Sequence, residues 1–314
     1  MEAFILNPGC APLSRNIEDY PEGIIVPINK PYRWTSADVI RKVKYAAIRH
    51  FGKKNLKVGH AGTLDPLATG VLLVCIGKAT KLAETLQSHD KEYIAGVTFG
   101  ATTPSYDLEK EIDRHFPYEH ISAEAVQDAL PAFIGEQDQI APLFSAKSVD
   151  GVRAYELARK LYKTIGGKDS NVLSPRTLGN SQTGDGISPT AFSTDSSEFD
   201  AVAESLIRVA KINISELELL KFESAANVRA SLPPTSAVSD ASSRINVTDN
   251  SALGLPQAVI RIACSKGTYV RAFARDLGEA LQSGAHLDSL VRSRSGEFKV
   301  ENALSIEQAI AALQ

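Results

Sequence analysis

The sequence of 314 residues is poor in cysteine and has no long apolar run. Its three cysteines, Cys10, Cys75 and Cys264, are far apart, which argues against a disulfide framework or a clustered zinc site. Because Cys75 and Cys264 each lie in an apolar, strand-like run, we expect buried free thiols. No stretch of about 18 apolar residues predicts a membrane span, and no basic start followed by an apolar core predicts a secretory signal. These absences favour a protein of the reducing cytoplasm.

Several motifs that bind cofactors are also missing. The sequence contains no phosphate-cradling Gly-x-x-x-x-Gly-Lys loop and no dinucleotide fingerprint. Its six histidines form no His-x-x-x-His pattern of the kind that binds zinc. The sequence therefore predicts neither a cofactor nor a bound metal ion.

Acidic residues are not in large excess, but the charges are unevenly distributed. The net charge is −3, yet residues 23–91 contain twelve Lys or Arg and only four Asp or Glu. Residues 92–140 contain two basic and ten acidic residues. Such asymmetry gives either one positive face for phosphates or two solvated surfaces of opposite sign, and charge alone does not decide between them.

Apolar periodicity predicts an α+β fold, a mixed sheet with helices packed outside it. Alternating or continuous apolar stretches predict strands at 23–28, 71–76, 91–100, 140–147, 212–222 and 258–264. Helical spacing predicts helices after Thr35 and Ser122, over 153–160, and after Gly267. Thr35 and Asp38 have the spacing of a capping box.

The chain divides into a short extension, one large domain and a terminal helix. Residues 1–21 have no clear pattern, 22–300 form the domain, and 301–314 have helical spacing. Two low-complexity insertions interrupt the domain at about 166–205 and 225–255. In residues 181–200, eight of twenty are Ser or Thr. Because such segments offer little apolar surface to offset the entropy of ordering, we expect flexible loops.

The most informative segment is 57–70, which reads KVGHAGTLDPLATG. Its glycines allow backbone conformations closed to other residues and let a bulky ligand approach the main chain. Asp65 lies between Leu64 and Pro66, a context that can hold a carboxylate rigidly. On general grounds such a segment is much more often a glycine-rich turn before a buried strand than a functional loop.

This segment resembles the Gly-His-Gly/Ala-Gly-Thr-Leu-Asp-Pro signature of TruB-type RNA pseudouridine synthases. Further segments resemble other motifs of that family in the same order along the chain. They are GIIVPINKP at 23–31, KEY at 91–93, QIAPLFSAK at 139–147, GVRAYELAR at 151–159, CSKGTYVR at 264–271 and LDSLVR at 287–292. The resemblance covers about residues 22–164 and 206–300, and the set is much more specific than any one motif.

The resemblance implies a pseudouridine synthase fold, with a mixed, mainly antiparallel sheet, flanking helices and a central cleft. It also implies an enzyme that isomerises a specific uridine in the T-loop of tRNA to pseudouridine. A base inside folded RNA is unreachable, so the nucleotide must be flipped out. The partner would be the T-arm of tRNA, and the enzyme would act as a monomer without a protein partner or cofactor.

The resemblance also assigns roles to individual residues. Asp65 would be the essential carboxylate, acting as nucleophile or as base. Tyr93 would stack on the flipped uracil, and Arg271 would pair with Asp65 and fix its orientation.

Other positions would bind the substrate. His60 would take the place of the extruded base, Tyr269 would pack beside the flipped base, and Leu290 would form an apolar wall. Gly62 and Thr63 belong to the same loop as Asp65. Residues for phosphate contacts would be Lys30, Lys57, Arg153 and Arg159.

The chain departs from the family pattern at its C-terminal end. Members with a full-length C-terminus carry an RNA-binding PUA domain after the final motif, whereas only 14 residues follow Val300 here. We therefore expect a short form that lacks this domain.

Three alternatives stay open from the sequence. They are a tRNA-folding chaperone without chemistry, a synthase acting on other RNAs, and a metabolic enzyme acting on a free nucleotide. The combination of Asp65, Tyr93 and Arg271 favours catalysis over binding alone, because binding does not require it.

Overall fold

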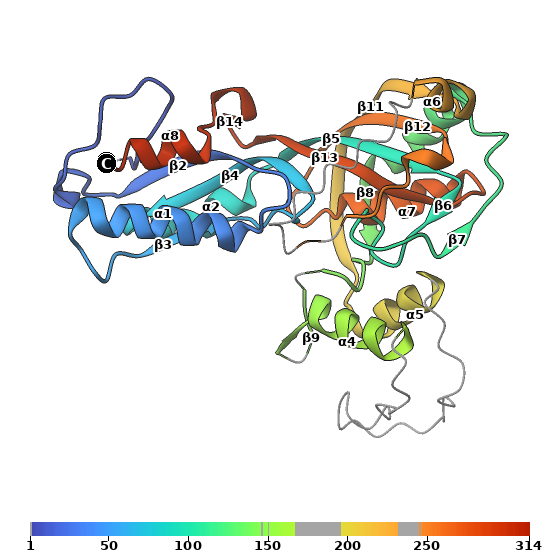
Figure 1. Cartoon of the computed structure of the whole chain (residues 1–314), viewed down its shortest axis with the longest axis horizontal. Helices are drawn as coiled ribbons and strands as arrows, with labels where there is room; N and C mark the ends of the chain where they lie inside the picture. The colour runs from blue at the N-terminus through green and yellow to red at the C-terminus, as the bar shows by residue number, and fades with distance from the viewer. Residues whose placement is uncertain (1, 146, 150, 167–195, 232–244, 246) are drawn as a thin grey trace.

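A single ten-stranded sheet runs through the whole length of the molecule (Figure 1). This computed structural model describes residues 2–145, 147–149, 151–166, 196–231, 245 and 247–314. The strands lie in the order β1 (Phe4–Ile5), β2 (Ile24–Lys30), β4 (Ala68–Ile76), β13 (Ala285–Ser295), β5 (Lys91–Phe99), β12 (Gln257–Cys264), β11 (Ala210–Glu223) and β8 (Gly135–Gln139). β3 (Val58–Ala61) pairs with β4, and β14 (Phe298–Lys299) pairs with β13.

The sheet is mixed and mainly antiparallel, which confirms the expected fold class. Within it only β1–β2 and β4–β13 pair in parallel. The β4–β13 pair joins the two halves of the sheet, with Leu290 opposite Ala68 and Arg292 opposite Gly70. The segment that carries Asp65 ends where β4 begins, so this segment lies at the centre of the sheet.

One half of the sheet is covered by α1 (Ser36–Phe51) and α8 (Ile306–Ala311). The predicted capping box is present: the Thr35 side chain accepts a hydrogen bond from the backbone of Asp38, and the Asp38 carboxylate accepts one from the backbone of Thr35. Val39 and Val43 of α1 pack against Leu72 of β4 in a common core. β4 is buried along nearly its whole length, as its continuous apolar run predicts.

The other half of the sheet packs against α7 (Val270–Ala280) and α3 (Ala123–Ala129). Phe273 and Leu277 of α7 meet Val97 of β5 and Ile260 of β12 in a second core. The remaining elements are short: α2 (Ala83–Ser88), α6 (Ala225–Ser231), and two small sheets formed by β6 (Ala101–Thr102) with β7 (Arg114–His115) and by β9 (Ser148–Val149) with β10 (Val152–Arg153).

Below this half in Figure 1 lie α4 (Ala154–Gly166) and α5 (Ser196–Leu206). α5 falls inside the first expected flexible insertion, and that expectation is wrong for this part. Ala203 and Ile207 are buried against Leu143 and Phe144, so the segment has enough apolar surface to fold.

The second insertion is also ordered at both ends. It begins with α6, and near its end the backbone NH of Thr248 donates to the carbonyl of Leu108. The carbonyl of Ile245 accepts hydrogen bonds from Arg33. The expectation of flexible loops otherwise falls on residues 167–195 and 232–244, which lie outside the described residues.

Three further predictions need correction. Residues 1–21 contain β1, and Leu6 and Leu13 are buried in the core, so this segment is packed rather than patternless. Residues 140–145 are not a strand, although Leu143 and Phe144 are buried. The terminal helix begins only at Ile306, after a short 3-10 turn over Val300–Asn302. Among the described residues, no helix has the length and apolar character of a membrane span.

Candidate active site

The loop that carries Asp65 is fixed from both sides by buried polar side chains. Ser36, at the start of α1, accepts a hydrogen bond from the Leu64 NH at 3.0 Å and donates to the Leu64 carbonyl at 3.2 Å. The ammonium of Lys30 donates to the carbonyls of Trp34 at 2.6 Å and Pro66 at 3.2 Å. Because these contacts hold the backbone on each side of Asp65, its carboxylate has a defined position.

The geometry corrects the expected role of Lys30. We expected a phosphate contact, but Lys30 is fully buried, and burial lowers the pKa of its ammonium to about 8. Its ammonium donates hydrogen bonds to backbone carbonyls, and these bonds offset the cost of burying the positive charge. Lys30 therefore stabilises the Asp65 loop from the interior of the protein.

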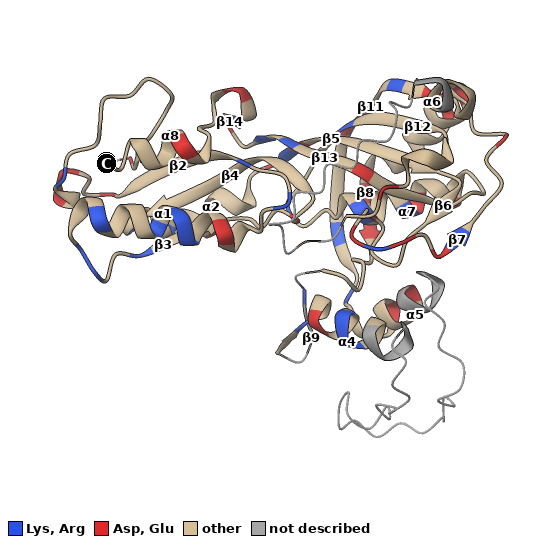
Figure 2. Ribbon diagram, viewed as in Figure 1, with Lys and Arg blue, Asp and Glu red and all other residues tan. Residues whose placement is uncertain are grey.

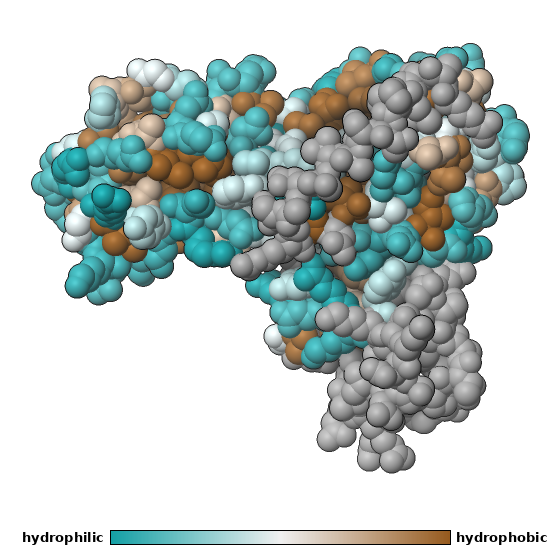
Figure 3. All heavy atoms as spheres, viewed as in Figure 1, coloured by the Kyte–Doolittle hydropathy of each residue, from teal (hydrophilic) through white to brown (hydrophobic). Residues whose placement is uncertain are grey.

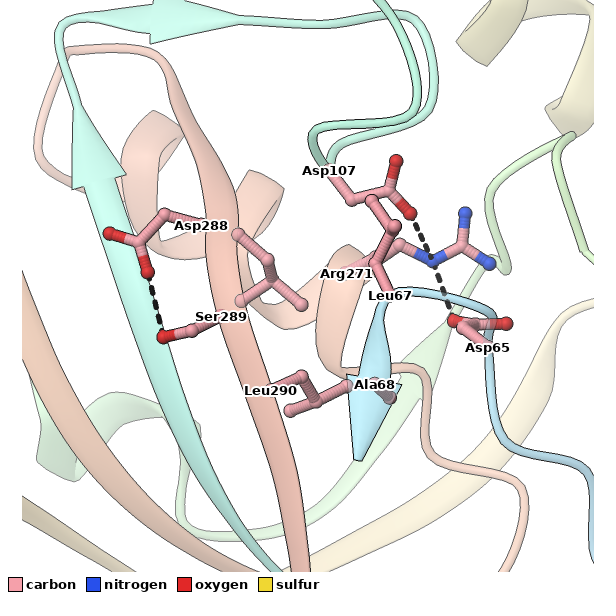
Figure 4. Close-up of a pocket in the computed structure, with 9 residues that line it drawn as sticks. Asp65, Leu67, Ala68, Asp107, Arg271, Asp288, Ser289 and Leu290 are labelled. Carbon is pink, nitrogen blue, oxygen red and sulfur yellow. Dashed lines mark hydrogen bonds and ion pairs between the residues drawn. The ribbon is translucent and has the colours of Figure 1, made fainter. Parts of the chain in front are cut away.

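Arg271 lies between two carboxylates in the site (Figure 4). Its Nε atom is 2.9 Å from Asp65 and 3.7 Å from Asp107. The expected contact between Arg271 and Asp65 is therefore present. Only 5% of the Arg271 side chain is exposed, whereas 37% of the Asp65 side chain is. Asp65 thus presents an oriented carboxylate that remains open to a ligand.

Asp107 was not identified from the sequence, although it lines the same pocket. Burial raises the pKa of its carboxyl to about 6, while Arg271 opposes that rise. Its carboxylate accepts hydrogen bonds from Ser105 at 2.6 Å and from the Glu109 NH at 2.9 Å. The sequence feature that could have identified Asp107 is its position in a Ser/Thr-rich turn directly after a strand.

The guanidinium of Arg271 also donates to two backbone carbonyls. One bond goes to Ser105 at 3.0 Å and another to Phe144 at 2.8 Å. Residues 140–145 are irregular rather than extended, and in this conformation the Phe144 carbonyl is turned toward α7 instead of a neighbouring strand. Three separate segments thus meet at one buried guanidinium.

Arg292 is the second residue whose role the sequence did not reveal. It ends the LDSLVR motif and is 1% exposed. Its guanidinium donates to the carbonyls of Val71 at 2.7 Å, Gly62 at 3.3 Å and Thr63 at 3.4 Å. The carbonyls of Gly62 and Thr63 are therefore held by the protein, and the positive φ of +89° at Gly62 shapes the turn.

Tyr93 lies opposite Arg292 across the β5–β13 pair. Burial raises the pKa of the Tyr93 hydroxyl, so the phenol stays neutral near pH 7. The Tyr93 ring packs against both core clusters, at the junction of the two halves. This position gives a fixed aromatic side chain close to the centre of the sheet.

The pocket itself is lined by apolar, charged and polar residues from four segments: Asp65, Leu67, Ala68, Asp107, Arg271, Leu287, Asp288, Ser289 and Leu290. Leu290 and Ala68 lie side by side on β13 and β4, as Figure 4 shows. Leu290 thus lines the same pocket as Asp65. The pocket places the partly exposed carboxylate of Asp65 beside an apolar wall formed by Leu67, Ala68, Leu287 and Leu290.

Tyr269 stands at the N-cap of α7, two residues before Arg271. The Gln139 side chain forms two hydrogen bonds with the Tyr269 backbone. It accepts one from the Tyr269 NH at 2.8 Å and donates one to the Tyr269 carbonyl at 3.2 Å. His60 lies on β3 and is partly buried. Burial and the positive charge of Arg292 lower the pKa of His60, which favours a neutral ring.

The exposed cations gather on α1 and on the segment that leads into β3, as the blue bands in Figure 2 show. Residues 39–64 contain no Asp or Glu. In the described part of the chain, no carboxylate pairs with the exposed cations Lys42, Lys44, Arg49, Lys54 and Lys57. We call these five residues the basic surface. Because α1 begins beside the Asp65 loop, the basic surface extends away from the site along α1 and the segment between α1 and β3.

Two other expected phosphate contacts lie near α4. Arg153 is exposed, and Arg159 forms an ion pair with Glu109 at 3.0 Å. On the face shown in Figure 3, apolar residues form separate patches divided by hydrophilic side chains.

Comparisons with known proteins agree with this geometry. The profile of the TruB family pseudouridylate synthase N-terminal domain matches residues 49–169. The tRNA pseudouridine synthase B of Phocaeicola vulgatus is 43% identical over 92% of this chain and 92% of its own length. The protein of the same name from Flavobacterium johnsoniae is 37% identical over 95% of this chain and 99% of its own.

Solved structures support the fold. A Cbf5-Nop10-Gar1 complex contains a chain that superposes with a TM-score of 0.53 at 19% sequence identity. The match covers 99% of this chain and 63% of the other, so this chain spans less than two thirds of that protein's length. Taken with the sequence relatives, which match along almost their whole length, these findings show that the chain belongs to the TruB family of pseudouridylate synthases.

Proposed function

We propose that this protein is a tRNA pseudouridine synthase that isomerises a uridine in the T-loop, with Asp65 as the essential carboxylate. The single observation that carries the proposal is the accessible carboxylate of Asp65, held at 2.9 Å by the buried guanidinium of Arg271 in a pocket with an apolar wall. A carboxylate fixed in this way needs little reorganisation to meet a reacting nucleotide.

The reaction detaches N1 of uracil from C1′ of the ribose, rotates the base, and joins C5 to C1′. The hydrogen on C5 then leaves as a proton, and N1 takes up a proton, so that the product is an isomer of the substrate. In our proposal Asp65 acts on the flipped nucleotide, either as a nucleophile or as a base. Arg271 holds the Asp65 carboxylate in a fixed orientation through their 2.9 Å contact. Tyr93 stacks on the uracil, and its buried, neutral hydroxyl is compatible with contact to an uncharged ring.

The remaining residues would hold the RNA around the flipped base. Leu290 forms the wall of the base pocket, and Tyr269 packs beside it. His60 fills the space that the base leaves in the RNA, a role that its largely neutral, flat ring suits. The basic surface would bind phosphates next to the T-loop.

We further propose that the protein acts as a monomer in the cytoplasm. Cys75 and Cys264 are buried free thiols, as expected, and a reducing compartment suits them.

The experiment that tests the substrate site uses a full tRNA transcript. After incubation with the protein, pseudouridines are located by carbodiimide modification and reverse transcription. We expect one stop in the T-loop, and none in a transcript whose T-loop uridine is replaced by cytidine. A stop in another arm would make this a synthase for another position. Tight binding with no modified base would favour a tRNA-folding chaperone instead.

A further inference from the structure

Asp200 on α5 reaches the loop that carries Asp107. Its carboxylate accepts a hydrogen bond from the hydroxyl of Tyr106 and lies 3.2 Å from the Arg275 guanidinium. Only 19% of the Asp200 side chain is exposed. The proposed chemistry uses none of these three side chains, so this buried polar group calls for another explanation.

Tyr106 has a backbone conformation that requires support. Its φ of +56° is unfavourable for a residue with a Cβ atom, and such a conformation persists only where surrounding contacts hold it. The Tyr106 NH donates to Thr103 at 3.0 Å, and the Tyr106 carbonyl accepts from Leu287 at 3.0 Å. Its ring is 2% exposed and lies under the Arg275 guanidinium, 5.8 Å from the ring centroid.

Both sequence neighbours of Tyr106 contact Arg271. The Ser105 carbonyl accepts a hydrogen bond from Arg271 at 3.0 Å, and the Asp107 carboxylate lies 3.7 Å from the Nε atom of Arg271. A shift of Tyr106 would move both groups, because they flank it directly. The position of this loop therefore determines how Arg271 is held.

α5 supports Arg271 by a second route. Ala203 and Ile207 share a buried cluster with Phe144, whose carbonyl accepts from Arg271 at 2.8 Å. Arg275 follows Arg271 by four residues, about one turn of α7, so both arginines lie on one face of that helix. Arg271 faces Asp65 while Arg275 faces Asp200, and the two ion pairs stack along α7.

We propose that Asp200 is a positioning residue of the active site, which holds residues 103–107 through Tyr106 so that Arg271 keeps Asp65 oriented. This inference rests on the proposed function. The helix that carries Asp200 belongs to a segment that sequence patterns assign to a flexible insertion. Because the docking of α5 fixes the loop that holds Arg271, it sets the rate of the chemical step. It contributes little to RNA affinity.

The test compares Asp200→Ala and Tyr106→Phe with wild type. The single-turnover rate constant at saturating T-arm RNA should fall about ten- to hundredfold, because a small displacement of a positioned catalytic group has an effect of this size. The Kd for the RNA should not change. The double variant should be no slower than the slower single variant, because both substitutions remove the same hydrogen bond. Asp200→Asn, which keeps an oxygen acceptor, should recover part of the rate.

The matched control is Glu204→Ala. Glu204 lies four residues after Asp200 on α5 and is exposed, so this variant makes the same loss of charge on the same helix. Hydrogen exchange of the backbone amides of residues 102–109, measured without RNA, should be faster in Asp200→Ala and unchanged in Glu204→Ala.

An unchanged rate constant in both Asp200→Ala and Tyr106→Phe would overturn the proposal. A weaker Kd with an unchanged rate would also overturn it and make α5 an RNA-binding element. If Asp200→Ala does not fold, Tyr106→Phe decides, since it removes a single hydroxyl. If wild type does not turn over T-arm RNA, the proposed function has failed, and hydrogen exchange alone then decides: unchanged exchange in Asp200→Ala would refute the positioning role.

Discussion

Replacing Arg271 with methionine removes the guanidinium between Asp65 and Asp107 and leaves a long apolar side chain in its place. Asp65 can turn toward water, but Asp107 is only 6% exposed and cannot. Removing one partner of a buried ion pair costs about 3–5 kcal/mol, because the other charge is left uncompensated. We expect Arg271→Met to reduce the free energy of unfolding at pH 8 by about this amount.

The reduction should depend on pH in a defined direction. Burial raises the native pKa of Asp107 to about 6, and removing Arg271 takes away the charge that opposes this rise. A carboxyl whose native pKa exceeds its unfolded value binds more protons in the native state. Stability therefore increases as the pH falls through the native pKa. The stability deficit of Arg271→Met relative to wild type should shrink between pH 8 and pH 5.

Urea unfolding, followed by the fluorescence of the single tryptophan, measures this deficit at both pH values. The control is the double variant Arg271→Met with Asp107→Asn, in which Asp107 no longer carries a buried charge. It should be more stable than Arg271→Met at pH 8. Because it lacks the Asp107 carboxyl, which stabilises wild type as the pH falls, its deficit relative to wild type should grow rather than shrink between pH 8 and pH 5. An equal deficit for Arg271→Met at pH 8 and pH 5 would refute the reasoning.

Other predictions address the supporting residues and the basic surface. Lys30→Met should lower the free energy of unfolding by about 1–3 kcal/mol, because buried carbonyls lose their donor, and should leave the salt dependence of RNA binding unchanged. A weaker salt dependence would mean that Lys30 contacts phosphate. Arg292→Lys should slow single turnover about ten- to hundredfold in rapid-quench assays at constant RNA affinity, since an ammonium cannot reproduce the guanidinium contacts; an unchanged rate would show that the loop does not need them. Replacing Lys42, Lys44 and Arg49 by glutamine should reduce the slope of log K against log salt by about 0.7–0.9 for each phosphate that the protein no longer neutralises, and an unchanged slope would mean that RNA does not touch α1.

Patterns that depend on local sequence predicted the structure well. The Thr35 and Asp38 capping box, the continuous apolar strand β4, and the strand that carries Tyr93 all follow from residue spacing and apolar periodicity. The Asp65 and Arg271 contact came from resemblance to a family, because 206 residues separate the two in sequence and no local pattern joins them.

The errors arise where tertiary contacts decide the structure. Lys30 looks like any basic residue beside a turn, and only the surrounding carbonyls make it a buried support. α5 lies at the edge of a Ser/Thr-rich segment, and its few apolar residues suffice because Phe144 and its neighbours cover them. Asp107 and Arg292 were missed because their importance depends on burial against distant segments, which composition does not reveal.

The measurement that tests the central claim most directly is tritium release from a T-arm hairpin containing 5-tritiated uridine. Wild type, Asp65→Asn and the control Asp138→Asn, an exposed carboxylate on β8, are compared at equal RNA occupancy. We predict release by wild type and by Asp138→Asn, and no release by Asp65→Asn although it binds the hairpin as tightly. Release by Asp65→Asn at the wild-type rate would contradict the assignment of Asp65 as the essential carboxylate.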